Sequence, residues 1–218
     1  MPKIGVGITT TSKRPDHKAH WENLIAFGSL CDGMKVYFAH DVVGIAKAKN
    51  ECLRNLQDCD YVFLFDDDTF PIADGWADHF INAHHRIGCH SFSYLHNYGD
   101  IRRVGSNKDV SIYSNAAGCM LFLTRDAIER VGSFNEAYGL YGYEHADYSE
   151  RVKLSGLAPH RNICPDNSQD YIYSMDLDSW KTFDFKHKST LTVAEMKAAH
   201  KVSVVEWMKP EPIIYLPL

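Results

Sequence analysis

The sequence predicts a single α/β domain whose mostly parallel central sheet carries helices on both faces, and three observations support this prediction. Apolar, β-branched runs alternate with helical patterns along the first third of the chain, which is typical of consecutive βαβ units. Residues 61–65 are all apolar, as expected of a strand buried on both faces of a parallel sheet. The 218 residues, of which 45% are hydrophobic, suffice for one large domain with a full core.

The first half of the chain supplies the expected parallel strands. Short, apolar and β-branched runs predict strands at 3–10 and 35–39, ahead of the strand at 61–65. The loop at 11–16 should lead into a helix whose apolar face is formed by Trp21, Leu24, Ile25 and Phe27 or Leu30. A second helix should open at Gly44, with one side formed by Ile45, Ala48, Cys52 and Leu56.

The second half gives weaker patterns. Helices are expected over 76–87, over 125–131 and from Glu144, and strands over 90–95 and 117–123. Residues 97–111 are polar, show no apolar stripe and are expected to form a loop, while 157–165 and 171–175 are weaker segments. Small residues open the strand at 117–123 and would let another group approach its backbone. A terminal helix is expected over 192–208, ended by Pro210.

Composition narrows the class of protein. A net charge of -5 argues against a general nucleic-acid binder, which would present a basic face. The six cysteines form no C-x-x-C pair and no zinc-like spacing, so we expect reduced, mostly buried thiols. With no signal-peptide pattern and no apolar run long enough to span a bilayer, we expect a cytoplasmic protein without a membrane span.

Three carboxylates, Asp66, Asp67 and Asp68, follow the buried strand directly. Right-handed crossovers bring the polar strand ends near Thr10, Asp41 and Asp66 to one edge of the sheet, where we expect a cleft. Adjacent carboxylates repel one another, and a divalent cation such as Mg2+ relieves that repulsion. The alternative is an acidic turn that caps the next helix, because Asp is favoured in turns and at N-caps.

Six motifs, in order, resemble those of GT-A fold glycosyltransferases, the large family of bacterial and viral nucleotide-sugar transferases with a D-x-D motif. The resemblance covers roughly residues 3–190, motif by motif. The matching segments are 8–15 (ITTTSKRP), 44–50 (GIAKAKN), 65–76 (FDDDTFPIADGW), 118–120 (GCM), 131–136 (VGSFNE) and 143–151 (YEHADYSER). Their shared order is a far stronger indication than any single motif.

The resemblance implies a Rossmann-like GT-A domain and a metal-dependent hexosyltransferase of the EC 2.4 class. Residues 1–100 would bind the nucleotide sugar and metal, residues 101–190 the acceptor, and residues 191–218 would form a helix and tail. The donor would be a nucleoside diphosphate sugar, UDP by preference, and the acceptor a hydroxyl on a glycan or glycoprotein. Asp68 would ligate the metal, and Asp66 would contact the ribose or a metal-bound water. His187 could be a third metal ligand, which would favour Mn2+ over Mg2+, or simply one of twelve histidines in a solvated loop.

Glu144 and Asp147 lie three residues apart and therefore share a helix face. One of them could take the proton from the acceptor hydroxyl, or Asp147 could simply pair with Arg151 at i+4. The sequence departs from the family here, because His145 replaces the second carboxylate, the usual base of inverting members. Glu144 and Asp147 rank ahead of His145 as the base, and inversion or retention at the anomeric carbon is left open.

The nucleotide is expected to bind at the ends of the first two strands, against Thr9, Thr10, Thr11, Arg14, Asp41, Lys47, Asp66 and Asp67. Asp41 could accept from a ring N–H, which favours uracil, and Arg14 or Lys47 could pair with the phosphates. Each is also a common type of solvated loop residue. Five aromatic residues could stack on a sugar ring or belong to the core: Trp76, Tyr138, Tyr141, Tyr143 and Trp180.

Two other functions fit parts of the pattern. A nucleotidyltransferase also places carboxylates and Mg2+ at a sheet edge, but a glycine-rich loop with a basic residue should then follow the first strand. Gly5 and Gly7 lie inside that strand instead. A non-catalytic carbohydrate- or nucleotide-binding protein on the same fold is the third possibility, and the His145 substitution favours it. The oligomeric state does not follow from the sequence.

Overall fold

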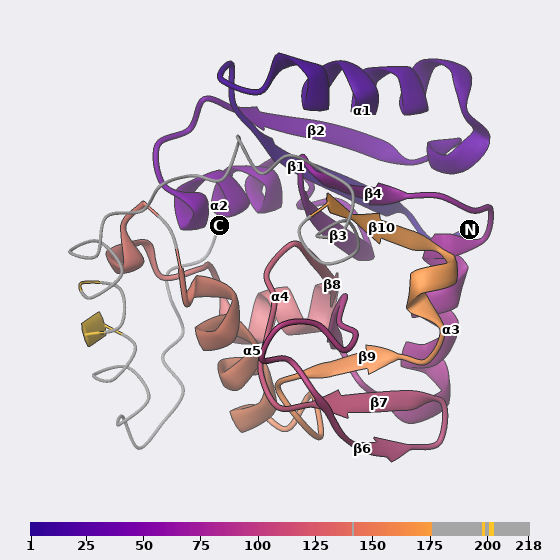
Figure 1. Ribbon diagram of the computed structural model, residues 1–218, viewed down its shortest axis with the longest axis vertical. Coiled ribbons are helices and arrows are strands. Elements are labelled where there is room, and N and C mark those ends of the chain that lie inside the picture. Colours follow the sequence, from indigo (N-terminus) through magenta and orange to yellow (C-terminus); the bar gives the residue numbers. More distant parts are fainter. Residues whose placement is uncertain (141, 176–197, 199–200, 203–218) are drawn as a thin grey trace.

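The structure is a computed structural model that describes residues 1–140, 142–175, 198 and 201–202. A five-stranded sheet of order β2-β1-β3-β8-β5 forms its centre (Figure 1). Its strands are β1 (Ile4–Thr10), β2 (Lys35–His40), β3 (Tyr61–Asp66), β5 (Ser91–Ser93) and β8 (Met120–Thr124). β2 and β3 both pair with β1 in parallel, and β8 is the one strand of this sheet that is antiparallel to the others. The prediction of a mostly parallel sheet is confirmed.

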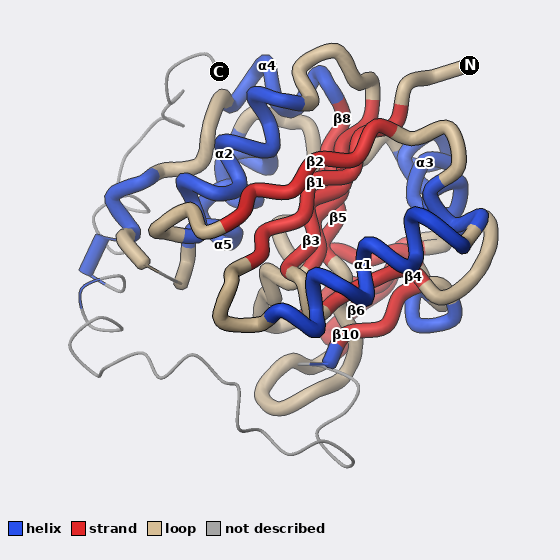
Figure 2. The backbone as a smooth tube through the Cα atoms, turned by 90° about the horizontal axis from the view of Figure 1, so that it is seen from above, coloured by secondary structure: helices blue, strands red, loops and turns tan. Residues whose placement is uncertain are grey.

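Helices cover both faces of this sheet, as Figure 2 shows. One face carries α1 (Pro15–Phe27) and α3 (Trp76–Ile87), and the other carries α2 (Ile45–Asn55), α4 (Arg125–Val131) and α5 (Glu144–Leu154). Alternate side chains of β3 explain the arrangement, because Phe63 and Phe65 both point to the α1 and α3 face. The ring of Trp76 lies 4.6 Å from that of Phe63, and the ring of Trp21 lies 5.1 Å from that of Phe65.

On the other face of the sheet, α2 packs closely against β1. A Cβ atom built on Gly7 would lie 2.6 Å from Cβ of Cys52, so only glycine lets α2 approach β1 this far. Ala48, Cys52 and Leu56 are buried, as the helical pattern predicts. All six cysteines are buried free thiols. In the part of the chain that the structure describes, no helix is long and apolar enough to cross a bilayer.

Two small sheets complete the fold. One contains β6 (Arg103–Asn107), β7 (Val110–Tyr113) and β9 (Ile163–Pro165), and the other pairs β4 (Thr69–Pro71) with β10 (Ile172–Ser174). The expectation of a loop over 97–111 is therefore wrong, because this segment contains β6 and begins β7. β6 is an exposed edge strand without an apolar face, and the hairpin turns at Lys108, whose φ is 53°. A strand of this kind carries no alternating pattern for sequence reasoning to detect.

The bounds of several other elements agree with those expected from the sequence. Helices α3 and α4 have the expected bounds, whereas the strand expected over 90–95 is the shorter β5. Three short 3-10 turns connect the larger elements, at Ser29–Cys31, Glu136–Tyr138 and Ser168–Asp170. The helix expected over 192–208 lies almost wholly outside the described residues.

Candidate active site

The polar ends of β1, β2 and β3 meet at one edge of the sheet. Thr9 is paired with Asp66 across β1 and β3, and Thr10 with His40 across β1 and β2. The chain leaves β1 for β2 on one side and returns to β3 on the other, so the strand order reverses at β1. Ligands of open α/β sheets bind at such a reversal, outside the carboxyl ends of the strands. The predicted shared edge is confirmed.

Asp66 ends β3 and is held from the β1 side. Thr9 Oγ1 donates to Asp66 Oδ1 at 3.0 Å and also lies 3.3 Å from the carbonyl oxygen of Phe65. Burial raises the pKa of Asp66 to about 7, and the carboxylates of Asp68 and Glu144 add to this rise while Lys49 opposes it. The raised pKa therefore reflects mainly the burial of Asp66, with a smaller contribution from the neighbouring carboxylates.

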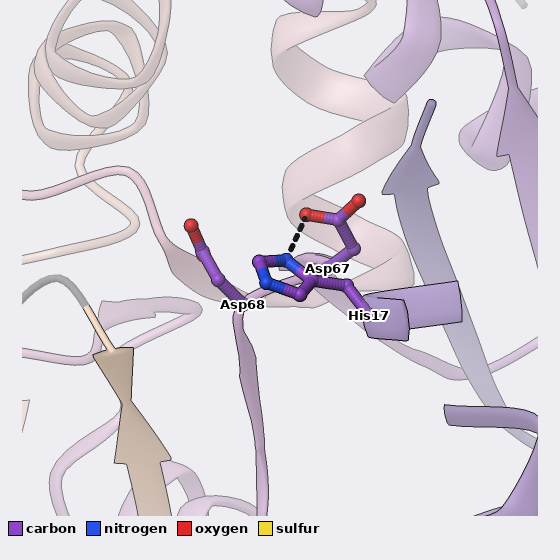
Figure 3. A group of neighbouring side chains, drawn as sticks. All are labelled: His17, Asp67 and Asp68. Atoms are coloured by element: carbon purple, nitrogen blue, oxygen red, sulfur yellow. Dashed lines mark ion pairs between the residues drawn. The ribbon is translucent and has the colours of Figure 1, made fainter. Parts of the chain in front are cut away.

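Asp67 and Asp68 face the start of α1 rather than the next helix. Arg14 Nη2 lies 2.8 Å from Asp67 Oδ1, and Arg14 Nη1 lies 3.1 Å from Asp68 Oδ2. His17 Nδ1 is 3.5 Å from Asp67 Oδ1, and Figure 3 shows the imidazole facing that carboxylate. The Asp67 side chain is completely buried, so the Arg14 guanidinium supplies its opposite charge, and the His17 imidazole lies beside it.

His17, Asp67 and Asp68 can each offer a ligand atom within 4.8 Å of the other two. Two carboxylates and an imidazole form a donor set that suits Mn2+ better than Mg2+, which prefers oxygen ligands alone. Of the metal ligands expected from the sequence, Asp68 belongs to this group, Asp66 is bonded to Thr9 instead, and His187 lies outside the described residues.

The residues expected to hold a nucleotide differ in their surroundings. Thr11 Oγ1 donates to Asp41 Oδ1 at 3.1 Å, and the backbone N–H of Ser12 donates to the same oxygen at 2.7 Å. These hydrogen bonds, that from the Ser12 backbone first, hold the pKa of Asp41 below its usual value. Thr10 Oγ1 is buried with no hydrogen-bond partner among the described residues, whereas Lys47 is exposed on α2. Thr9 and Thr11 therefore brace neighbouring carboxylates.

A buried ion pair joins α2 to α5. Lys49 Nζ lies 2.9 Å from Glu144 Oε1 and donates to the carbonyl oxygen of Gly118 at 3.1 Å. The exposed fractions of the Lys49 and Glu144 side chains are 1% and 2%. Burial alone would raise the pKa of Glu144, but the Lys49 ammonium and the neighbouring His145 hold it well below its usual range. Burial would lower the pKa of Lys49, yet Glu144 and Asp66 keep it raised.

Asp147 is also engaged within the protein. Its Oδ2 accepts from Arg151 Nε at 3.0 Å, and both side chains are buried. The same guanidinium donates to the carbonyl oxygens of Val131 and Ser133, at 2.6 and 2.9 Å. The i+4 pair considered from the sequence is thus present, and it fixes the turn after α4 to α5.

His145 is the most accessible of the three candidate bases. Its Nδ1 lies 3.4 Å from Glu144 Oε1. A Cβ atom built on Gly118 would lie 2.6 Å from that nitrogen, so the ring rests directly on the glycine backbone. The small residues before β8 therefore do admit another group, as predicted, and that group is the His145 ring.

The aromatic candidates separate by burial. Trp76 is a core residue whose Nε1 donates to the carbonyl oxygen of Leu30 at 2.6 Å, and Tyr138 is buried as well. Tyr143 is 36% exposed. Tyr141 and Trp180 lie outside the described residues. Tyr143 is thus the candidate for contact with a sugar among those described.

Sequence reasoning missed two residues of this site, Lys49 and His17. A signal for both is present in helical spacing, because Lys49 lies midway between Ile45 and Leu53 on the buried stripe of α2. His17 likewise lies one turn before the buried Trp21. A charged or titratable residue on an apolar stripe requires a buried partner, which here is Glu144 or Asp67.

No family model matches the chain. Over 147 residues it is 31% identical to an uncharacterized glycosyltransferase of Acanthamoeba polyphaga mimivirus, a match that covers 62% of this chain and 56% of that protein. Among solved structures it resembles a mannosyltransferase from Pyrobaculum calidifontis in complex with GDP-Man and Mn2+. The TM-score is 0.54 at 13% identity, with 76% of this chain and 55% of that chain covered.

A second solved structure is the catalytic domain of Drosophila β1,4-galactosyltransferase 7 in complex with xylobiose. It has a TM-score of 0.52 at 12% identity, with 90% of this chain and 79% of that chain covered. The chain has the GT-A fold. The resemblance to GT-A glycosyltransferases drawn from the sequence is thereby confirmed. The chain spans little more than half the length of the mimivirus protein and of the mannosyltransferase.

Proposed function

We propose that this GT-A protein is a metal-dependent hexosyltransferase. It would move a sugar from a nucleoside diphosphate sugar, UDP by preference, to a hydroxyl of a glycan or glycoprotein. The observation that carries the proposal is the cluster of Arg14, His17, Asp67 and Asp68 at the carboxyl edge of β3, on a fold shared with solved sugar transferases. The buried free thiols favour a cytoplasmic site of action.

The metal would be held by Asp68, with Asp67 and His17 beside it. Manganese is favoured over magnesium by the imidazole, and also by the solved relatives, one of which holds GDP-Man with Mn2+ and another manganese, UDP-Gal and xylobiose. When bound, a divalent ion neutralises the charge that develops on the leaving diphosphate. Arg14 supports the same task, because a guanidinium pairs with phosphate as readily as with the carboxylates that it now bridges.

The nucleotide would lie against the ends of β1 and β2. Thr10 offers a hydroxyl without a hydrogen-bond partner among the described residues. Asp41 uses Oδ1 to hold Thr11 and Ser12, which leaves Oδ2, 3.3 Å from His40 Nδ1, as the oxygen for a ring N–H. This arrangement favours uracil, whose N3–H is a donor.

A nucleotidyltransferase is the less favoured alternative. Its nucleotide phosphates would need a glycine-rich loop after the first strand. Gly5 and Gly7 instead lie inside β1 and face Cys59 and Cys52 on the helical side, where any side chain would collide. The glycines serve packing.

Donor consumption separates these functions. The protein is incubated with Mn2+ and, in turn, UDP-Gal, UDP-Glc and GDP-Man, and release of nucleoside diphosphate is measured. A glycosyltransferase releases UDP or GDP, even if slowly and to water. A parallel incubation supplies UTP and a sugar 1-phosphate with Mn2+, from which a nucleotidyltransferase instead releases pyrophosphate. Release of pyrophosphate, or binding of nucleotide without consumption of any donor, would contradict the proposal.

A further inference from the structure

A hollow of about 240 Å³ lies beside the first turn of α5. Its lining includes Asn115, Gly142, Tyr143, His145, Arg161 and Asn162. We infer that this hollow binds one sugar residue of the acceptor, that His145 is the base which takes the proton from its hydroxyl, and that Glu144 is a positioning residue for His145. The inference rests on the proposed function and names the acceptor class and the base of the same reaction.

The size and the lining of the hollow fit a single sugar ring. Pockets for drug-sized ligands have volumes of about 300–1,000 Å³, so this hollow takes a smaller group. Amide, guanidinium and imidazole groups line it together with alanine and glycine, which suits a sugar, because a sugar has both hydroxyl groups and apolar C–H faces. Arg161 is itself paired with Glu150 at 3.5 Å, so its charge is partly balanced and a neutral ligand is favoured over an anion.

Asn162 supplies a hydrogen-bond acceptor that the protein does not use. The residue is 2% exposed, and its Nδ2 donates to the carbonyl oxygen of Tyr113 at 3.3 Å, which fixes the orientation of the amide. Its Oδ1 is buried with no hydrogen-bond partner among the described residues. An unpaired buried acceptor costs about 1–3 kcal/mol, so a ligand hydroxyl that donates to it binds favourably.

Tyr143 is strained where it lines the hollow. It caps α5 with φ 67° and ψ -12°, a left-handed conformation that a tyrosine rarely adopts. Such strain costs about 1–3 kcal/mol and is concentrated at active sites and ligand clamps. The conformation places a half-exposed aromatic ring at the rim, where it can pack on the apolar face of a sugar.

His145 is arranged as a base. The carboxylate of Glu144 lies 3.4 Å from its Nδ1, and a neutral ring that donates to this carboxylate from Nδ1 has the lone pair of Nε2 available. Lys49 holds Glu144 from the other side, which keeps the carboxylate charged and fixed. Glu144 and Asp147 are buried ion-paired carboxylates, so neither can reach an acceptor as readily as the imidazole that lines the hollow.

The step conserves atoms and charge. The acceptor hydroxyl gives its proton to Nε2 of His145 while its oxygen forms a bond to the anomeric carbon of the donor sugar. The bond between that carbon and the diphosphate oxygen breaks, and its electron pair stays on the nucleoside diphosphate. The imidazolium, stabilised by Glu144, then releases its proton to water. The charged and titratable groups near this ring are Glu144 on α5 and, behind Glu144, Lys49 on α2, while Tyr143 and Arg161 line the same hollow.

The test compares His145→Gln with His85→Gln, a control on the exposed surface of α3. The rate of donor consumption is measured with Mn2+ and with methyl β-xyloside, methyl β-galactoside or methyl α-mannoside as the acceptor. The acceptor that gives the highest rate is used for the comparison, and water serves as the acceptor if no glycoside raises the rate. We expect His145→Gln to lower kcat at least about 100-fold, the low end of general-base catalysis, with UDP affinity unchanged. Added imidazole should also restore part of the rate of His145→Ala.

The sugar site has its own test that needs no turnover. Saturation-transfer NMR should detect binding of at least one of the three methyl glycosides to wild type and to His85→Gln, and a loss of that signal in Asn162→Ala. No glycoside binding to wild type would overturn the assignment of the hollow. A folded His145→Gln protein that consumes donor at the wild-type rate would overturn the base. Failure of the wild type to consume any donor would instead overturn the proposed function itself.

Discussion

Lys49 on α2 and Glu144 on α5 form an ion pair across 2.9 Å with almost no exposure to solvent. Asp66, at the end of β3, feels the same ammonium, because Lys49 opposes the rise in its pKa. One buried cation therefore connects the acidic end of the central strand to the helix that carries His145. This relationship gives the site a fixed distribution of charge before any ligand binds.

Removing Lys49 should destabilise the protein strongly. Lys49→Met leaves the Glu144 carboxylate buried without its cation, and breaking a buried pair in this way costs about 3–5 kcal/mol. Lys49→Met/Glu144→Met should recover most of that free energy of unfolding, since two apolar side chains replace both charges. Urea denaturation of wild type, both single variants and the double variant gives the coupling. A coupling near zero would show that the pair contributes nothing.

The same pair should make stability depend on pH. The pKa of Glu144 is held below its ordinary value of 4.5, so its stabilising charge is present above that pH and is lost as the pH falls further. Lys49→Met lacks the cation that depresses the pKa. Burial then raises the pKa of Glu144 above 4.5 in this variant, so the deficit of Lys49→Met in free energy of unfolding should be largest at neutral pH and shrink as the pH falls and protonation removes the buried charge. A deficit that grows on acidification would contradict this assignment.

Asn50 joins two of the sequence motifs directly. Its amide donates to the carbonyl oxygen of Phe134 and to Glu136 Oε1, both at 3.0 Å, and its Oδ1 accepts from the Phe134 N–H at 2.7 Å. Asn50→Ala should cost about 1–3 kcal/mol for each buried group left unpaired, measured by thermal or urea unfolding. Asn55→Ala is the control on the same helix, where the lost bond is exposed and the cost should be small.

Gly118 should be needed for the position of the His145 ring. Gly118→Ala would place a Cβ atom 2.6 Å from His145 Nδ1, so the imidazole must move. We expect a fall in the rate of sugar transfer with little change in UDP affinity. Gly105→Ala is the control, since its nearest contact would be an ordinary 3.9 Å. Equal rates for the two variants would show that the ring position does not matter.

The central sheet and its helices could be predicted from the sequence because their signals are local and apolar. Residues 62–65 of the apolar run and the stripe of Ala48, Cys52 and Leu56 are buried, as their patterns predict. β6 could not be predicted, because an exposed edge strand leaves no alternation of apolar and polar residues. β4 is only three residues long and forms by pairing with β10 more than 100 positions later, which no local pattern records.

The type and location of the site could be predicted from the sequence better than the ion pairs of its residues. Asp68 and the meeting of the strand ends follow from position alone, since parallel strands share a carboxyl edge. The partners of Asp67 and Glu144 do not follow from position in the sequence. The packing of α1 brings Arg14 and His17 to Asp67, and the packing of α2 brings Lys49 to Glu144. Whether a carboxylate is available as a base depends on such partners. Sequence spacing placed Glu144 and Asp147 on one helix face and offered Arg151 as the partner of Asp147, but it could not show that Lys49 pairs with Glu144.

Nucleotide selectivity tests the role of Asp41. A displacement assay across UDP, GDP, CDP and dTDP should show the tightest binding for UDP and dTDP, whose bases carry an N3–H between two carbonyl groups. Asp41→Asn should reduce that preference, both by removing the accepting carboxylate and by loosening Thr11 and Ser12. Preference for GDP in the wild type would contradict the uracil assignment and leave the transferase proposal intact.

The central claim is that the acidic edge of β3 binds a nucleotide through a divalent ion held by Asp68. Calorimetric titration of UDP, with and without Mn2+, tests it directly on wild type, Asp68→Ala and the exposed control Asp32→Ala. We expect Mn2+ to tighten UDP binding by wild type and Asp32→Ala at least about tenfold, or about 1.4 kcal/mol, and to have no such effect on Asp68→Ala. Binding of UDP with the same metal dependence in Asp68→Ala, or with none in wild type, would contradict the claim.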